Sequence, residues 1–367
     1  MTVLTDRHLN RATLARQMLL TRANMDLVAA VEWLIGLQGQ VSEGPYQGLW
    51  SRLTGFHHED LTALIVTRRL LRATSLRSTL HLHTLADLTG LRPHVQPVLD
   101  RMWKSAFGNR RFGANDIGAV HRAGIGLLDQ GPMTGGALGK ALTAQFPDGE
   151  PLAKSVLLQV KEILVQIPPT RIWGSGHAPI LTRLENWAPP PYPGPVDLGD
   201  LVRRYLRAYG PATVADMQAW SGLTRLGDAF AAIREELVTY EAEDGRTLFD
   251  LAAASLTEPD FSAPPRFLPL FDNVYLGYAD RRRLLVPGDE ARLNILNEYT
   301  PAVLVDGRIR AGWAISTRKG VASLAITPYH PLRKKDLPAL EREGLAFLTF
   351  MQPDATSQAV EILPLAP

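Results

Sequence analysis

Two glutamines stand on either side of one glycine near the N-terminus, at Gln38, Gly39 and Gln40. A side-chain amide has an oxygen that accepts hydrogen bonds and an NH2 group that donates them. Two amides this close together could hold one water molecule between them, although neither is a strong proton donor. The pattern suits a reaction in which a positioned water attacks and the leaving group departs without being protonated.

The same residues also have a purely structural interpretation. The segment Met25–Leu37 has the apolar periodicity of a helix. A glycine shortly after a helix often terminates it, and the two glutamine side chains could bond the last carbonyl groups. Both interpretations place Gln38-Gly39-Gln40 at the end of a helix.

The composition is that of an ordinary globular protein, since 46% of the residues are hydrophobic and 21% are charged. At 367 residues the chain is long enough for two or three domains. Cysteine is absent, which excludes disulfides and thiolate metal sites. No run approaches the roughly 18 apolar residues of a membrane span, and the N-terminus lacks a signal-peptide pattern. We therefore expect a cytoplasmic bacterial protein.

Positive charge is concentrated in two parts of the chain, although the net charge is only +2. Ten basic and four acidic residues lie between Arg52 and Arg111, and Arg281, Arg282 and Arg283 form a second cluster. Arginine suits phosphate because its planar guanidinium binds two oxygens at once. One arginine alone is usually a solvated surface charge, but two such stretches favour a basic groove for nucleic acid. We expect the second cluster to lie on a hairpin or loop, either reaching a phosphate backbone or simply solvated.

A repeated motif marks two turns of the chain. Gly131-Pro132-Met133-Thr134 and Gly210-Pro211-Ala212-Thr213 each follow an amphipathic segment, at 121–130 and 198–209. In both copies proline favours a turn and threonine is placed to cap the next helix. In the second copy, an aspartate three residues after the threonine predicts a capping box.

Both copies predict the element order of a winged helix, in which helices are followed by a two-stranded hairpin. In the second copy we expect helices over 198–209, 213–220 and 224–237, and strands over 238–240 and 246–249. In the first copy we expect a long helix over 152–166 and strands over 171–173 and 180–184. Residues 188–195, rich in proline, form a stiff linker between the two units.

A more divergent unit precedes these two, and a β-rich part follows them. For the N-terminal unit we expect helices over 12–20, 25–37 and 60–71, a strand over 76–83, and a helix capped by Thr84. For the C-terminal part we expect strands over 301–306, 308–316 and 321–327 and a helix over 337–351. The predicted fold is mainly α with β wings (α+β), built from three tandem winged-helix units at 1–115, 116–190 and 191–255 and a C-terminal β-rich region with a basic hairpin at 256–367.

Five short segments resemble motifs of a known family and occur in the family's order. They are Leu37–Gln40, Arg77–Leu82, Leu268–Asp272, Leu276–Arg281 and Pro301–Gly307. On these residues the chain resembles the bacterial winged-helix DNA glycosylases typified by AlkZ and YcaQ. The resemblance implies tandem winged helices around a DNA channel and excision of alkylated purines.

The resemblance also implies roles for particular residues. The family's catalytic motif is Gln, an apolar residue, then Gln or Asp, so Gln38 and Gln40 fall on its two polar positions as catalytic residues. Gly39 departs from the pattern at the middle position. The family places the following strand beside this motif, so Arg77, Thr79 and His81 are candidate DNA-binding residues, and the basic cluster Arg281–Arg283 is another.

Several other residues have side chains that could take part in chemistry. His81 and His83 lie on one face of a strand, but two histidines without a further ligand make a poor zinc site, so no metal and no cofactor is expected. Asp60, Asp87 and Asp272 are alternative catalytic carboxylates. We interpret Asp87 as a helix-capping residue and Asp272 as a structural partner.

The sequence therefore predicts a monofunctional DNA glycosylase that removes N7-alkylguanine-type bases, including bulky adducts or interstrand crosslinks, by attack of water at C1′. The predicted partner is double-stranded DNA containing alkylated bases, and the protein is expected to be a monomer. We expect it in the cytoplasm, associated with the nucleoid through DNA, and without membrane contact. The alternatives are a winged-helix transcription regulator and a catalytically inactive DNA-binding relative.

Overall fold

The computed structural model describes residues 2–286, 288–289 and 300–366 of the chain. The N-terminal part is helical, as its periodicity predicts, although its first helix starts earlier than expected, the next two predicted helices are shorter, and the helix Gly44–Arg52 was not predicted. These helices are α1 (Asp6–Arg16), α2 (Leu27–Trp33), α3 (Gly44–Arg52) and α4 (His58–Val66). The side chain of Thr5 caps α1 and that of Asp26 caps α2.

The helix predicted over 25–37 ends early, and this changes the setting of the Gln38-Gly39-Gln40 motif. Helix α2 stops at Trp33, and the next residues reverse the chain, since Ile35 has a φ of 56° and Gly36 a φ of 90°. A Cβ atom on Gly36 would lie 2.4 Å from the ring of His83, so only glycine fits there. The motif therefore begins on a strand rather than at a helix end, and the proposal that its glutamines cap a helix is wrong.

One antiparallel sheet of six strands joins the N-terminal part to the segment that follows it. Its strands, in spatial order, are β2 (Leu37–Gln38), β4 (Leu80–Thr84), β3 (Leu70–Thr74), β6 (Leu164–Ile167), β7 (Ile180–Arg183) and β5 (Met133–Thr134). The junction between the two parts is the pairing of β3 with β6, in which Arg72 stands opposite Gln166.

Helices extend from this sheet into one arm of the molecule. They are α5 (Leu85–Phe112), α6 (Ile117–Gln130), α7 (Gly135–Gln145), α8 (Pro151–Lys161) and the short α9 (Leu184–Trp187). Thr84 and Thr134 cap α5 and α7, as predicted. The helix predicted over 152–166 ends at Lys161 because strand β6 begins at Leu164. The strand predicted over 171–173 is absent, and those residues lie in the loop between β6 and β7.

The second copy of the repeat has the predicted order of three helices and a hairpin. Its elements are α10 (Leu198–Tyr209), α11 (Val214–Ser221), α12 (Gly227–Ala232), the 3-10 turn η2 (Arg234–Glu236), β8 (Leu237–Ala242) and β9 (Thr247–Leu251). The predicted capping box is present, since Thr213 Oγ1 accepts from Asp216 N and Asp216 Oδ2 accepts from Thr213 N. Strand β1 (Val3–Leu4) adds in parallel to β8.

The C-terminal part contains a second large sheet. Its strands, in order, are β10 (Arg266–Phe267), β11 (Ala302–Val305), β12 (Arg308–Arg318), β13 (Val321–Pro328) and β14 (Ser357–Ile362). Helix α15 (Leu337–Met351) covers this sheet, and its Phe347 packs on Phe267 and Trp313. Three of these strands and α15 were predicted, whereas the parallel strand β14 was not. The short helix α13 (Asn273–Leu276) precedes β11.

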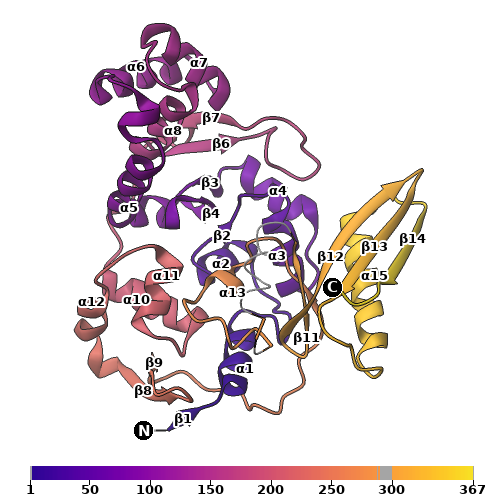
Figure 1. Ribbon diagram of the computed structural model, residues 1–367. Helices are drawn as coiled ribbons and strands as arrows, with labels where there is room; N and C mark the ends of the chain where they lie inside the picture. Colours follow the sequence, from indigo (N-terminus) through magenta and orange to yellow (C-terminus); the bar gives the residue numbers. More distant parts are fainter. Residues whose placement is uncertain (1, 287, 290–299, 367) are drawn as a thin grey trace.

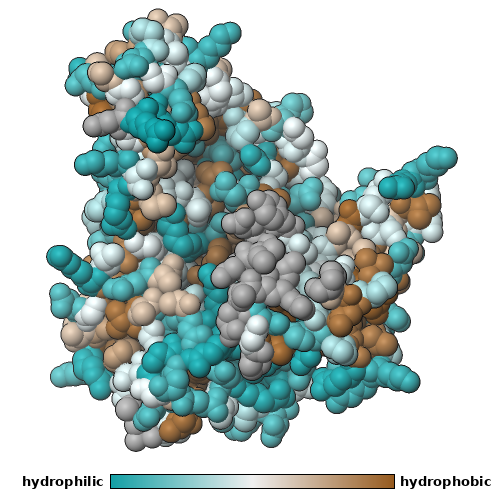
Figure 2. Space-filling model, viewed as in Figure 1, coloured by the Kyte–Doolittle hydropathy of each residue, from teal (hydrophilic) through white to brown (hydrophobic). Residues whose placement is uncertain are grey.

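Helices α5–α8 and α10–α12 share one hydrophobic core. Buried residues of α5, α8 and α10, such as Leu99, Leu157 and Leu206, belong to the same cluster. Figure 1 shows the arm with α6–α8 and a second arm with β12–β14 and α15 projecting from a centre that contains β2 and α1–α3. Figure 2 shows a wide indentation of the molecular outline between the two arms. The predicted unit boundaries at 115, 190 and 255 remain predictions.

No helix within the described residues is both long and apolar enough to cross a membrane.

Candidate active site around Gln38 and Gln40

Gln38 lies on the edge strand β2, directly opposite His81 of β4. Its side chain is nearly buried, at 9% exposure, and its Oε1 accepts a hydrogen bond from Arg77 Nη2 at 2.9 Å. The backbone N–H of Gln38 donates to Asn273 Oδ1 at 3.3 Å. The amide of Gln38 is therefore held in one orientation by a charged donor.

Gln40 is in a different position, because it is exposed at the start of the turn that leads to α3. Its Oε1 lies 3.5 Å from the backbone N of Leu80, at the limit of a hydrogen bond. The two amides of the motif are thus not equivalent: Gln38 is fixed inside the site and Gln40 faces outward.

The glycine between them is tightly held by its backbone. Gly39 N donates to Leu80 O at 2.7 Å, and Gly39 O accepts from Arg72 Nη1 at 2.9 Å. The φ of Gly39 lies outside the left-handed region, so the backbone conformation itself does not require glycine. Both peptide groups of Gly39 therefore have partners despite the freedom that glycine gives to a chain.

Arg77 occupies the short 3-10 turn η1 (Leu76–Ser78) with a left-handed φ of 53°. Besides Gln38, its guanidinium donates to Trp220 O and to His81 Nε2, the latter at 3.3 Å. Burial lowers the pKa of Arg77 to about 10, so it remains protonated at neutral pH. Arg77 was predicted to contact DNA, and the structure places it as the support of Gln38.

His81 is buried at 2% exposure. Burial, followed by the charge of Arg77, lowers its pKa well below the usual 6.5, so the ring is neutral. Nε2 then accepts from Arg77 while Nδ1 donates to Thr79 O at 3.1 Å. The hydroxyl of Thr79 donates to Leu76 O at 3.1 Å. Both predicted DNA-binding residues therefore have intramolecular partners, and His81 does not reach the surface.

Asn273 was missed by the sequence analysis. It is buried at the start of α13, where its Nδ2 donates to Gly36 O at 2.6 Å and its Oδ1 accepts from Gln38 N. Asn273 thus bonds the backbone of Gly36 and of Gln38, the two neighbours of Leu37, and links them to the C-terminal part of the chain. A lone asparagine after Leu268–Asp272 carries no sequence signal that would have identified it.

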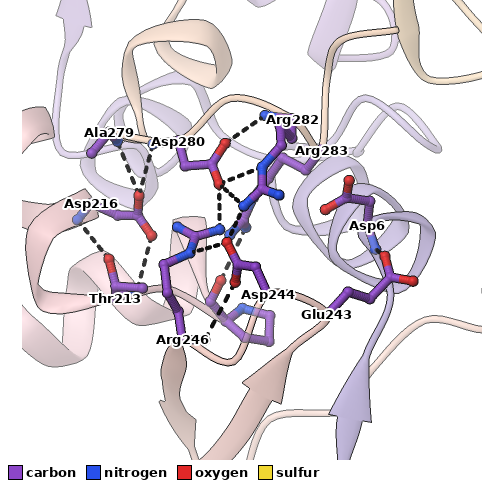
Figure 3. A network of polar contacts seen from close by, with 11 residues as sticks. Asp6, Thr213, Asp216, Glu243, Asp244, Arg246, Ala279, Asp280, Arg282 and Arg283 are labelled. Carbon is purple, nitrogen blue, oxygen red and sulfur yellow. Dashed lines mark hydrogen bonds and ion pairs between the residues drawn. The ribbon is translucent and has the colours of Figure 1, made fainter. Parts of the chain in front are cut away.

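The three basic residues at 281–283 lie in a turn rather than in a hairpin, and each has a different environment. Figure 3 shows Arg282 and Arg283. Arg282 forms ion pairs with Asp244 and Asp280. Arg283 is buried at 4% exposure and donates to Pro211 O at 3.0 Å. Arg281 has no carboxylate partner within the described residues; it stacks on the ring of Tyr275 and donates to its hydroxyl. Because Arg283 is buried, it is not a candidate for a DNA contact.

Guanidinium groups without a carboxylate partner gather around the motif. Within the described part of the chain, the ion pairs include none for Arg72, Arg77, Arg171 or Arg281. Their hydrogen bonds go instead to neutral oxygens and to His81. Arg171 Nη1 donates to Ser42 Oγ at 2.8 Å, and the charge of Arg281 contributes to lowering the pKa of Arg77. The surroundings of Gln38 and Gln40 are therefore positive.

The alternative carboxylates all have structural partners. Asp60 Oδ2 accepts from His57 N at the start of α4. Asp87 was predicted to cap α5, but its carboxylate forms an ion pair with Arg204 at 2.6 Å instead. The cap of α5 is the hydroxyl of Thr84. Asp272 pairs with buried Arg52 at 2.7 Å, in agreement with the predicted structural role.

Glu43 is the carboxyl group nearest to the motif along the chain. It precedes α3 and is partly buried. Burial raises its pKa above the usual value. Among the described residues, no group of three or more acidic, histidine or cysteine side chains could hold a metal ion.

Comparison with known proteins identifies the class of protein. A family model described as "DNA glycosylase AlkZ-like" matches residues 31–350, which include the motif and all six strands of the sheet that carries it. The chain therefore belongs to the family of AlkZ-like DNA glycosylases.

Two matches come from Streptomyces sahachiroi. A protein described as "Interstrand DNA cross-link repair glycosylase" is 27% identical over 153 residues, covering 39% of this chain and 40% of that protein. The solved structure of the DNA glycosylase AlkZ matches with a TM-score of 0.78 and 22% identity, covering 99% of this chain and all of that one. The structural match confirms the predicted α+β fold class as a mixture of helices and sheets.

Proposed function

We propose that this protein is a monofunctional DNA glycosylase that excises alkylated purines of the N7-alkylguanine type from duplex DNA. Family membership supports glycosylase activity, and the relative described as a cross-link repair glycosylase supports bulky or crosslinked lesions as substrates. The observation that carries the proposal is the pair of neutral amides of Gln38 and Gln40, one fixed and one exposed, with no carboxylate among the described residues bonded to either.

The chemistry follows from the charge of the substrate. An N7-alkylguanine is cationic, so its glycosidic bond is weakened and the base departs neutral without a general acid. The enzyme then has to place a water at C1′ and stabilise the oxocarbenium-like sugar. We assign the water to Gln38 and Gln40, whose amide oxygens each have a second lone pair that can accept from it.

The orientation of Gln38 is central to this assignment. Because Arg77 donates to Gln38 Oε1, the amide cannot rotate freely. An oxygen polarised by a charged donor is a weaker acceptor, so Gln38 acts mainly by positioning the water. Gln40, which is exposed, completes the contact from the DNA side.

A monofunctional reaction that leaves an abasic site is expected from the residues around the motif. A lyase would need an amine to form a Schiff base with the sugar. The described hydrogen bonds of Gln38, Gly39 and Gln40 involve no lysine.

Double-stranded DNA is the proposed partner, with the chain acting as a monomer. Three winged-helix units in one chain need no dimer to surround a duplex, whereas single-unit regulators commonly dimerise on paired half-sites. Arg281 is the strongest candidate of the basic cluster for a phosphate contact, because it is partly exposed and has no carboxylate partner among the described residues.

The two alternatives are a regulator that binds DNA without chemistry and a catalytically inactive relative. Mass spectrometry of the bases released from randomly alkylated and from crosslinked duplex DNA separates them from an enzyme. We expect free modified purine and an abasic strand that is not cleaved. Protection of one discrete sequence without base release would support a regulator, and tight binding without sequence preference or release would support an inactive relative.

A further inference from the structure

We propose that Arg72 is a positioning residue for the catalytic motif and that Gly39 and Arg72 act as one unit, in which the arginine occupies the space of the missing side chain at position 39. The inference rests on the proposed function. It assigns a role to a residue that neither the sequence motif nor the family match singles out.

Arg72 reaches the motif from the middle of the sheet. It lies on β3, where it is paired with Leu82 of β4 on one side and Gln166 of β6 on the other, and it is 1% exposed. Strands on both sides fix the backbone of Arg72. Its guanidinium is therefore presented to the motif from a rigid base.

The guanidinium binds the motif on both sides of Gln40. Its Nη1 donates to Gly39 O at 2.9 Å and its Nη2 donates to Ser42 O at 3.1 Å. These two carbonyl groups bracket Gln40 and Val41, the exposed residues of the turn. One side chain thus fixes both ends of the segment that carries the exposed catalytic amide.

A side chain at position 39 would point at the guanidinium of Arg72. A Cβ atom on Gly39 would lie 3.3 Å from Arg72 Nε, which is a tight contact, and 3.4 Å from Arg72 Cζ, at the near limit of an ordinary contact. Any larger side chain in that direction would overlap the guanidinium. A side chain at position 39 and the guanidinium of Arg72 would therefore occupy the same volume. In this protein Arg72, from strand β3, occupies it.

Stability alone does not account for a buried arginine here. Within the described residues Arg72 has no carboxylate partner, and its buried Nε has no hydrogen-bond partner. Burial, followed by the charge of Arg171, lowers its pKa to about 10. Burying an unpaired charge destabilises the folded state. An apolar residue at this position would therefore give a more stable sheet.

A second arginine strengthens the same anchor. Arg171, in the loop between β6 and β7, donates to Ser42 Oγ while Arg72 donates to Ser42 O. Two guanidinium groups, one from strand β3 and one from the loop between β6 and β7, thus donate to Ser42. The turn after the motif is therefore held by two side chains that lie 30 and 129 positions from Ser42 in the sequence.

The test compares Arg72→Met, Gly39→Leu and the double variant Gly39→Leu/Arg72→Met. Each is assayed for single-turnover release of N7-methylguanine at saturating enzyme, for DNA affinity and for Tm. Displacing a catalytic group by about 1 Å costs roughly 10²-fold in rate, so we expect each single variant to be slower by roughly 10- to 100-fold with little change in DNA affinity. The double variant should be no slower than Arg72→Met alone, because the leucine then displaces no guanidinium, although the two hydrogen bonds of Arg72 to the turn stay lost.

Arg92→Met is the matched control. Arg92 is partly buried, and its hydrogen bonds among the described residues go to the backbone carbonyls Val160 O and Glu162 O rather than to the motif. We expect it to lower Tm while leaving the release rate of folded enzyme unchanged. An equal loss of rate in Arg72→Met and Arg92→Met would show a general effect of destabilisation and would overturn the inference.

Two further results would overturn it. One is a wild-type rate in folded Arg72→Met, and the other is a double variant that is slower than both single variants. Should Arg72→Met not fold, Gly39→Leu supplies the test, since its side chain extends beyond the Cβ position into the volume of Arg72; a wild-type rate in that folded variant would reject the shared volume. Absence of release by the wild-type enzyme would reject the proposed function itself, whereas an active wild type with undiminished variants rejects only this inference.

Discussion

At the scale of single residues, the Gln38-Gly39-Gln40 motif holds two amides with different environments. Gln38 is buried and bonded to Arg77, whereas Gln40 is exposed and only loosely bonded to the backbone. The sequence shows that two amides are close together, but not that one of them is held by a charged donor. In the proposed mechanism the two amides therefore contribute differently: Gln38 would fix the direction of the water, and Gln40 would close the site when DNA is bound.

Arg77→Met should slow base release by roughly tenfold or more at saturating enzyme, because Gln38 loses its orienting donor. The rate and the DNA affinity should respond differently, with the larger change in the rate. A variant with weaker DNA binding and an unchanged rate at saturation would instead make Arg77 the DNA contact that the sequence suggested.

At the scale of elements, strongly periodic segments were predicted well. Helices α10 and α15 begin and end at the predicted residues, since amphipathic helices carry a repeating signal along their whole length. Strands β2 and β14 were not predicted. A two-residue strand is too short to show a period, and the position of β14 depends on pairing with a distant strand.

The candidate site was predicted only in part, for the same physical reason. The motif itself is a local pattern, so Gln38 and Gln40 could be found from the sequence. Arg72 and Asn273 bond the motif from other elements, and such contacts depend on the three-dimensional arrangement of the chain. In the sequence Arg72 was one of ten basic residues between Arg52 and Arg111 and had no feature of its own.

The turn at 281–283 gives a prediction that separates structure from DNA binding. Arg283→Met should lower the free energy of unfolding by about 2 kcal/mol, because buried hydrogen bonds from a charged group are lost. It should leave the salt dependence of DNA affinity unchanged. Arg281→Met should show the opposite pattern, with the slope of log Kd against log salt concentration reduced by up to about one. Titrations at several salt concentrations and urea unfolding check both, and a changed salt slope in folded Arg283→Met would contradict the assignment.

The buried ion pair between Arg52 and Asp272 joins α3 to the segment before α13. Asp272→Asn leaves the arginine without its counter-charge and should destabilise the fold by about 3–5 kcal/mol. Because this aspartate has a structural role, the release rate per folded molecule should stay close to that of the wild type. Denaturant unfolding together with rates corrected for the folded fraction tests this, and an inactive but fully stable variant would restore Asp272 as a catalytic carboxylate.

At the scale of the whole molecule, buried neutral histidines make stability depend on pH. His83 is fully buried in the sheet, and neither ring nitrogen has a hydrogen-bond partner among the described residues. Burial lowers its pKa to about 4. The unfolded chain, with an ordinary histidine pKa near 6.5, takes up a proton first as the pH falls. Its contribution to stability is complete above about pH 6.5 and decreases as the pH falls toward 4.

This linkage predicts a loss of about 3 kcal/mol from His83 between pH 6.5 and pH 4. The burial of His81 acts in the same direction. Urea unfolding at several pH values should show the loss in the wild type and a shallower dependence in His83→Leu. Identical pH profiles for the two proteins would contradict a buried neutral His83.

The most direct test of the central claim is the rate of base release from a duplex with one N7-methylguanine. Wild-type enzyme should release the base, and Gln38→Ala and Gln40→Ala should each be slower by roughly 10²–10³-fold, while Glu43→Gln stays near the wild-type rate. Glutamine variants that are folded, bind DNA and release the base at the wild-type rate would contradict the account, and a loss confined to Glu43→Gln would assign the reaction to a carboxylate.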